Sequence, residues 1–287
     1  MTTQAEKLRE KGPIFFCEKI LGTELYQYQK DIINAVFENP RVTVRSGNAA
    51  GKTYLAANLI LSFLYLNSPS VVISTAPTYN QVEKLIWKEI RTLYHGANDR
   101  IVGGLGGTLL PRAPELYLTN KWFAIGLSTN QPERLQGYHE ENLLLVVDES
   151  SGIKDDIFEA AQRILTSKNT HILQIGNPNP PKETTGNYFY DSFNSEIYKK
   201  FNINAFDTIN FTTFGITQED IESGKWKEKI GNSKLPSPYL VTPQWVDAMS
   251  TQWGIDSAAY SISVLGEYPK DGANNLIPVE WLRAATQ

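Results

Sequence analysis

Apolar and polar residues alternate with two different periods along most of this 287-residue chain. Short runs of apolar and β-branched residues predict strands at residues 42–44, 71–75, 143–147 and 171–175. Between these runs, longer segments have the spacing of helices, and they lie at residues 54–66, 80–94 and 157–165. This order is typical of an α/β fold with a mainly parallel central sheet flanked by helices.

Three further segments refine this picture. Residues 115–118 and 122–125 flank a Thr-Asn turn and predict a hairpin. Residues 54–66 are apolar nearly all round. The stretch is too short to span a bilayer, so we expect it to be a helix buried inside the protein. From about residue 208 the periodicity loosens, and a Lys-rich stretch at 224–234 is followed by several prolines.

A loop of small residues joins the first predicted strand to the helix that begins at Lys52. The strand end and loop read Arg45, Ser46, Gly47, Asn48, Ala49, Ala50, Gly51, Lys52 and Thr53. Such a loop binds phosphate oxygens through its backbone N–H groups, and the helix N-terminus adds partial positive charge. We expect Lys52 to reach the terminal phosphates and the Thr53 hydroxyl to hold Mg²⁺. The usual first glycine is Ser46 here, so the first turn of the loop departs from the common P-loop pattern.

An acidic pair, Asp148 and Glu149, follows the apolar run at residues 143–147. One interpretation is a solvated strand end, but five preceding apolar residues favour a central strand, whose end is where α/β proteins carry sites. We expect Asp148 to hold Mg²⁺ through water and Glu149 to polarise an attacking water. Together with the phosphate loop, the pair predicts hydrolysis of a nucleoside triphosphate. At least one strand is expected between the loop strand and this strand, as in the additional-strand, catalytic-glutamate (ASCE) class of P-loop ATPases.

Composition restricts the class of protein only broadly. The chain is 41% apolar and 20% charged, which is ordinary for a globular enzyme domain. Its formal net charge is −4, whereas most nucleic-acid-binding domains are basic. A local basic patch is still compatible with this net charge. The single cysteine, Cys17, excludes an internal disulfide, and the N-terminus lacks the apolar region of a signal peptide. We therefore expect an intracellular protein with no membrane partner.

Several segments in order carry a resemblance to a known family. They lie at residues 25–33, 74–82, 132–139, 176–190 and 265–269, and they include Gln27-Tyr28-Gln29, Ala76-Pro77-Thr78, Gly176-Asn177-Pro178 and Gly266-Glu267-Tyr268-Pro269. Together with the phosphate loop and the acidic pair, they resemble the ATPase half of a tailed-bacteriophage large terminase subunit, the motor that packages DNA into a procapsid. The resemblance covers about residues 25–283.

The resemblance implies roles for five further residues. Tyr28 and Gln29 would contact adenine, although an aromatic residue on a helix is more often part of a core. Asn177 would sense the terminal phosphate, with a plain turn as the alternative. Arg134 would be an arginine finger that enters the site of a neighbouring subunit, where such residues raise the rate about a thousandfold or more. Arg45 is the alternative finger, acting within its own chain.

The same resemblance implies cofactors, partners and domain organisation. The cofactors would be ATP and Mg²⁺. The partners would be double-stranded DNA, neighbouring copies in a ring on the procapsid portal, and the small terminase subunit, all in the cytoplasm of the host cell. Residues 21–208 would form the ATPase core, and residues 209–287, with or without residues 1–20, a lid or linker subdomain. We expect no nuclease activity, because only Glu280 follows Asp271 among the carboxylates, which leaves the family's C-terminal nuclease domain outside this sequence.

Two questions stay open at this stage. The lysines of the predicted lid are either a solvated face or contacts for DNA phosphates, and they are Lys225, Lys227, Lys229 and Lys234. The function has two alternatives, a helicase- or remodeller-like DNA translocase, or a nucleotide-dependent assembly switch that is not a motor. A helicase would require a second sheet domain, and a switch would show no steady turnover of ATP.

Overall fold

The computed structural model describes residues 4–128, 135, 137–138, 140–180 and 188–269. The chain divides into two compact units. The first unit comprises residues 1–44, 51–176 and 181–201, and the second comprises residues 45–50, 177–180 and 202–287. Two short segments, residues 45–50 and 177–180, therefore belong to the second unit although the residues before and after each belong to the first.

The central sheet has eight strands in the order β3-β4-β5-β2-β6-β7-β1-β8. The strands are β1 (Arg41–Ser46), β2 (Val71–Ala76), β3 (Thr108–Leu109), β4 (Glu115–Thr119), β5 (Trp122–Ser128), β6 (Asn142–Asp148), β7 (Asn169–Gly176) and β8 (Lys199–Ile203). Strand β2 pairs in parallel with β5 and β6, and β6 pairs in parallel with β7. Strand β4 is antiparallel to β3 and to β5, which confirms the predicted hairpin.

The position of β7 confirms the expected sheet order and identifies the inserted strand. In space β7 lies between β1, which leads into the phosphate loop, and β6, which carries the acidic pair. The strands that lie between them in sequence, β2 to β5, are all on the other side of β6. The additional strand is thus one that follows the acidic pair along the chain.

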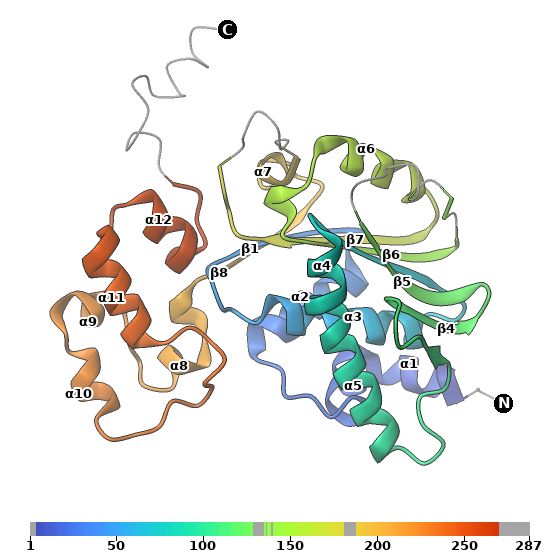
Figure 1. Cartoon of the computed structure of the whole chain (residues 1–287), viewed down its shortest axis with the longest axis horizontal. Coiled ribbons are helices and arrows are strands. Elements are labelled where there is room, and N and C mark those ends of the chain that lie inside the picture. Colours follow the sequence, from blue (N-terminus) through green and yellow to red (C-terminus); the bar gives the residue numbers. More distant parts are fainter. Residues whose placement is uncertain (1–3, 129–134, 136, 139, 181–187, 270–287) are drawn as a thin grey trace, which may run out of the picture. The chain divides into compact units, whose positions relative to one another are not determined.

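Helices cover both faces of the sheet in the first unit. They are α1 (Gln4–Phe15), η1 (Phe16–Ile20), α2 (Gln27–Glu38), α3 (Lys52–Leu66), α4 (Tyr79–Gln81), η2 (Val82–Ile86), α5 (Trp87–Arg100), η4 (Ser150–Gly152), α6 (Asp155–Ile164) and α7 (Tyr188–Ser192). Helices α1, α2, α3 and α5 lie on one face, and α6 and α7 lie on the other (Figure 1). Between them, the apolar residues of the central strands are fully buried, because a parallel sheet covered on both faces needs apolar side chains on both.

The buried helix predicted after the phosphate loop is α3, and its few polar residues are satisfied internally. Asn58 accepts a hydrogen bond from the Thr23 hydroxyl (2.9 Å) and donates one to the Tyr54 carbonyl (2.9 Å). The Ser62 hydroxyl donates to the Leu59 carbonyl (3.0 Å). These bonds allow polar side chains to be buried without leaving unpaired groups in an apolar layer.

The second unit is built from short helices around a core of its own. They are η5 (Ala205–Asp207), α8 (Ile209–Thr212), α9 (Gln218–Ser223), α10 (Trp226–Ile230), α11 (Pro243–Trp253), α12 (Ala258–Tyr260) and η6 (Ser261–Leu265). Phe211, Trp226, Val246 and Tyr260 are among the residues of its core. In the described part of the whole chain, no helix has the length and apolarity needed to cross a bilayer.

Candidate nucleotide-binding site

The predicted strand, loop and helix are present around Lys52. Strand β1 ends at Ser46, and α3 begins at Lys52 with Gly51 as its N-cap. Gly51 has the left-handed conformation (φ 73°, ψ 26°), which glycine adopts without steric cost. Ala49 is also left-handed (φ 49°), and a residue with a Cβ is strained in that region. The loop therefore turns twice through conformations that an ordinary loop avoids.

The first half of the loop is held by carbonyl groups of the second unit. The Gly47 N–H donates to the Ile203 carbonyl (2.9 Å), and the Asn48 N–H donates to the Ser263 carbonyl (2.7 Å). The Ala49 carbonyl accepts from the Val241 N–H (3.1 Å). The backbone of Gly47, Asn48 and Ala49 is thus tied to three other segments of the second unit.

The acidic pair stands at the end of β6. Asp148 is the last residue of the strand and is 3% exposed, so the interpretation as a solvated strand end is excluded for this residue. The Asp148 carboxylate accepts a hydrogen bond from the backbone N–H of Glu149 (3.0 Å). Glu149 has the left-handed conformation (φ 48°, ψ 45°), so the chain turns sharply between the two carboxylates. Two consecutive acidic residues are thereby placed in different surroundings.

The end of β7 supports this turn through close packing. The Ser150 hydroxyl donates to the Val147 carbonyl (2.7 Å) and accepts from the Ile175 N–H (3.2 Å), which joins β6 to β7. At Gly176, an added Cβ would lie 2.9 Å from the Ser150 backbone nitrogen and 3.3 Å from the Glu149 carbonyl carbon. A side chain at Gly176 would therefore displace the Glu149 turn.

Charges in the first unit couple Lys52 to the acidic pair. Burial, and then the Glu149 charge, raise the pKa of Asp148 to about 6, while Lys52 and the Glu149 N–H oppose this rise. Burial lowers the pKa of Lys52, and the charges of Glu149 and Asp148 counteract that shift. Each buried charge is thus stabilised by the opposite charge beside it. Clusters of this kind are candidates for functional sites.

Comparisons with known proteins show which proteins this chain resembles in sequence and in fold. No protein-family model matches the chain. The chain is 26% identical over 270 residues to a probable terminase large subunit of Enterobacteria phage P7, and the match covers 92% of this chain and 50% of the relative. The chain thus spans about half the length of that curated relative.

Solved structures show the fold directly. The large terminase ATPase domain of Thermus phage P74-26 matches with a TM-score of 0.60 at 17% identity, over 88% of this chain and 96% of that domain. The large terminase of the thermophilic bacteriophage D6E matches with a TM-score of 0.51 at 11% identity, over 71% of this chain and 50% of that protein. The same terminase in complex with ADP matches with a TM-score of 0.50 at 10% identity, over 70% of this chain and 50% of that protein. The chain has the fold of a large terminase ATPase domain. The predicted resemblance and the predicted fold class are both confirmed.

On this terminase ATPase fold, the donor groups fit magnesium. Thr53 supplies a hydroxyl, and Asp148 supplies a buried carboxylate that needs a nearby cation. Magnesium is usually bound by one or two carboxylates together with phosphate oxygens and water, so it requires no dense cluster of acidic ligands. Accordingly, the described residues contain no group of three or more His, Cys, Asp or Glu that could hold a metal ion.

The Gln29 side chain makes hydrogen bonds within the protein that do not involve adenine. Its side chain is 1% exposed, and its Oε1 accepts from the Tyr26 N–H (3.0 Å) as part of the N-terminal cap of α2. Its Nε2 donates to the Gly51 carbonyl at the end of the phosphate loop (3.3 Å). The Tyr28 ring stacks on Tyr26, with 5.9 Å between ring centroids. Gln29 therefore joins α2 to the N-cap of α3, and its contact with adenine stays a prediction.

The remaining predicted residues fall into two groups. In the second unit, Asn177 is 8% exposed and donates through Nδ2 to the Asn48 side-chain oxygen (2.9 Å), so it contacts the loop directly. Arg45 lies over the ring of Tyr268, 5.8 Å from its centroid. Arg134 lies outside the described residues, as do its neighbours at 129–133 and the second part of the 176–190 segment, at 181–187.

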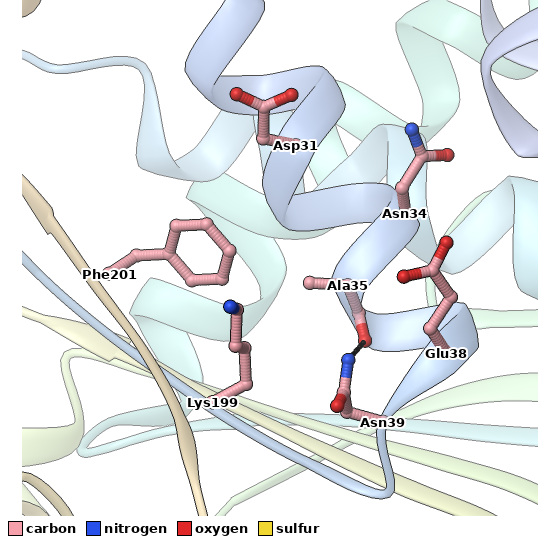
Figure 2. Close-up of a pocket in the computed structure, with 7 residues that line it drawn as sticks. All are labelled: Asp31, Asn34, Ala35, Glu38, Asn39, Lys199 and Phe201. Atoms are coloured by element: carbon pink, nitrogen blue, oxygen red, sulfur yellow. Dashed lines mark hydrogen bonds between the residues drawn. The ribbon is translucent and has the colours of Figure 1, made fainter.

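A shallow hollow of about 500 Å³ occurs elsewhere in the first unit (Figure 2). It lies between α2 and β8, and its lining residues are Asp31, Asn34, Ala35, Glu38, Asn39, Lys199 and Phe201. None of the predicted nucleotide-binding residues lines it. The hollow is therefore separate from the predicted nucleotide-binding residues, and the position of the nucleotide at Lys52 and the acidic pair stays a prediction.

Sequence reasoning missed two glycines that pack against the site. Gly176 and Gly266 lie within the family-like segments, but nothing local in those segments predicts a structural role for either glycine. Their importance comes from how closely another backbone approaches them, which no local pattern encodes. The available signal in the sequence was that each glycine begins a short segment with polar residues, Gly176-Asn177 and Gly266-Glu267-Tyr268.

Proposed function

We propose that this chain hydrolyses ATP and uses the energy to move double-stranded DNA into a procapsid, as the motor part of a large terminase. The observation that carries this proposal is the electrostatic coupling of Lys52, Asp148 and Glu149 in the first unit of a terminase ATPase fold. The D6E terminase with the same fold was solved with ADP, which supports a nucleotide as the ligand.

The residues of this site divide the chemistry between them. Lys52 binds the terminal phosphates, and Asp148 and Thr53 would hold Mg²⁺, which when bound would supply positive charge to the phosphates. Glu149 orients a water molecule towards the γ-phosphate and accepts its proton. The sharp turn at Glu149 separates this role from that of Asp148, because a carboxylate engaged by the metal is a poor base. Asn177, bound to Asn48, is suited to report on the terminal phosphate.

Other parts of the motor belong to the same proposal. Adenine would lie near Tyr28 and Gln29, and either Arg134 from a neighbouring copy or Arg45 from the same chain would act as the arginine finger. Residues 209–287 would form the lid. The partners would be duplex DNA, copies of this chain in a ring on the procapsid portal, and the small terminase subunit, in the host cytoplasm.

The helicase-like alternative is less well supported than the motor. The terminase ATPase domain matches over 88% of this chain and 96% of that domain, and the described strands form one eight-stranded sheet. The assembly-switch alternative differs from the motor in one measurable property, which is steady turnover of ATP.

The Glu149→Gln variant tests the proposal. We expect it to bind Mg-ATP with an affinity within a few-fold of the unmodified chain and to lose steady-state ATPase activity by about 10²- to 10⁴-fold, since general base catalysis contributes that much. The Glu141→Gln variant is the control, because Glu141 is an exposed carboxylate just before β6. ATP binding without turnover in the unmodified chain would favour the switch, and unchanged turnover in Glu149→Gln would remove Glu149 from the mechanism.

A further inference from the structure

The first turn of the phosphate loop is held by three segments that are distant in sequence. Within the second unit, Ile203 at the end of β8 accepts from Gly47, and Ser263 in η6 accepts from Asn48. Asn177 binds the Asn48 side chain (2.9 Å). The loop conformation therefore depends on residues outside the loop.

Two glycines make the closest of these contacts. An added Cβ on Gly47 would lie 2.7 Å from the Val264 carbonyl oxygen and 2.9 Å from that of Ser263. An added Cβ on Gly266 would lie 2.7 Å from the Gly47 nitrogen and 2.7 Å from the Ile203 carbonyl oxygen. All these neighbours are backbone atoms, which cannot turn away as the end of a flexible side chain can. The two backbones therefore approach each other at a distance that only glycine permits on both sides.

The same segment also contacts the residue before the loop. Tyr268 lies under the Arg45 guanidinium, and the Leu265 carbonyl accepts from the Asn202 side chain (3.3 Å). Residues 263–268 thus contact Arg45, Gly47 and Asn48 in succession. Since residues 45–50 are themselves predicted nucleotide-binding residues, a displacement of the first turn moves part of the predicted phosphate loop.

We propose that Gly266 is a positioning residue for nucleotide binding, because it allows residues 263–268 to fix the first turn of the phosphate loop. This inference rests on the proposed function. A misplacement of about 1 Å can cost about a hundredfold in the rate of a reaction. A side chain at Gly266 forces a shift of at least a few tenths of an ångström at Gly47 or Ile203, so ATP affinity weakens even though Gly266 itself contacts no nucleotide.

A matched control separates positioning from simple backbone strain. Gly266 has φ +63°, where any residue other than glycine is strained. Gly215, in the same unit, has φ +59° and would place an added Cβ within 4 Å of no other atom. The Gly266→Ala and Gly215→Ala variants thus introduce the same kind of strain, but only the first presses on the loop.

The test compares both variants in the full chain by Mg-ATP titration, thermal unfolding and hydrogen exchange of the 45–50 segment. We expect Gly266→Ala to raise the dissociation constant of ATP about tenfold or more over Gly215→Ala, and to lose protection of the Gly47 and Asn48 amides. Equal ATP affinity in two folded variants would overturn the inference. If Gly266→Ala does not fold, Asn202→Ala decides instead: it removes the bond to Leu265 without adding atoms, and we expect weaker ATP binding and less amide protection.

The exchange measurement keeps this inference distinguishable from the proposed function. If the unmodified chain and Gly215→Ala both fail to bind ATP, the proposed function fails. Amide protection at residues 45–50 would still show whether Gly266 sets the loop. If the unmodified chain binds ATP and Gly266→Ala loses protection without losing affinity, the proposed function stands and the positioning role is wrong.

Discussion

Ala49 and Glu149 are the two residues other than glycine that have positive φ in the described part of the chain. Such conformations cost about 1–3 kcal/mol each and persist only where the surrounding structure enforces them. Ala49 is enforced by the bond from Val241 to its carbonyl, and Glu149 by the packing of Gly176 and Ser150 behind it. Both strained residues fall on the two motifs that predict nucleotide hydrolysis, which is where stored strain serves a function.

Cys17 allows a test of burial at a single atom. Burial raises the pKa of the Cys17 thiol from 9.0 to about 12, so the folded chain keeps the unreactive thiol form at pH 8. Since this is the only cysteine, any alkylation reports on it alone. We expect iodoacetamide at pH 8 to label the unfolded chain in urea at least tenfold faster than the folded chain, as measured by mass spectrometry.

The same shift predicts a pH dependence of stability. The folded state holds the thiol proton more tightly than the unfolded state, so this stabilisation is complete below pH 9 and is lost as the pH rises towards 12. A Cys17→Ala variant should lose less stability than the parent between pH 9 and 10.5 in urea titrations. Rapid labelling of the folded chain at pH 8 would contradict the buried position of Cys17.

At the scale of elements, β7 and the turn after β6 meet at Gly176. An added Cβ there would crowd the Ser150 nitrogen and the Glu149 backbone, so we expect Gly176→Ala to lower the turnover of ATP by at least tenfold by shifting Glu149. Steady-state kinetics at saturating ATP would measure the effect. In Gly96→Ala the new Cβ makes only ordinary contact with Arg100, in the interior of α5, so this control should be neutral or slightly stabilising. Equal turnover in both variants would mean that the close approach does not set Glu149.

Elements whose signal is local could be predicted from the sequence. The apolar run of β6 and the all-round apolar surface of α3 reveal their burial, because covered parallel strands and enclosed helices need apolar residues on every side. The helix expected at 80–94 also exists, but it extends from α4 through α5 and contains the π-helical turn η2. A π-turn depends on local hydrogen bonding that hydrophobic spacing does not reveal.

Features that depend on distant contacts could not be predicted. The insertion of β7 between β1 and β6 depends on how the chain crosses the sheet, and strand order has no local signature. The bond from the Gln29 side chain to the Gly51 carbonyl joins α2 to the N-cap of another helix, α3. The contact between Gly266 and the phosphate loop also joins residues that are far apart in the sequence. Local motifs in the sequence thus predict chemical groups for the site, but they do not predict the distant contacts that hold those groups.

In the second unit, one buried side chain joins two elements. Asn210 of α8 is fully buried; it donates to the Ser237 and Val241 carbonyls (2.7 and 3.0 Å) and accepts from the Ser237 N–H (3.0 Å). Asn210→Ala leaves these backbone groups without partners, which should cost about 2–4 kcal/mol in the free energy of unfolding. Asn232→Ala is a matched control, because Asn232 is an exposed asparagine of the same unit. A loss below 1 kcal/mol in urea unfolding would contradict the role of Asn210.

At the scale of the whole molecule, charge limits how this chain can hold DNA. The net charge of −4 offers no general attraction to phosphate, so a DNA contact must come from a local group of cations. The lysines of the second unit are not equivalent in this respect. Lys229 binds Asp220 (2.6 Å) and the Gly215 carbonyl (2.7 Å), and its hydrogen bond is the main reason that the pKa of Asp220 falls to about 2. Lys229 is thus held by the fold although it is exposed, whereas Lys225 and Lys234 are exposed and make no ion pair with the described residues.

This difference predicts a change in the salt dependence of DNA binding that a general loss of positive charge would not cause. Each lysine that contacts a phosphate contributes about 0.9 to the slope of log affinity against log salt concentration. We expect the Lys225→Ala/Lys234→Ala double variant to bind duplex DNA more weakly and with a slope smaller by about 1.8, in fluorescence anisotropy at several salt concentrations. The Lys121→Ala/Lys168→Ala double variant removes the same charge from exposed positions of the first unit and should keep the slope of the unmodified chain. If both double variants lose affinity equally and keep their slopes, the effect is one of overall charge. The lysines of the second unit would then be a solvated face, and the grip on DNA would have to come from other residues or from the assembled ring.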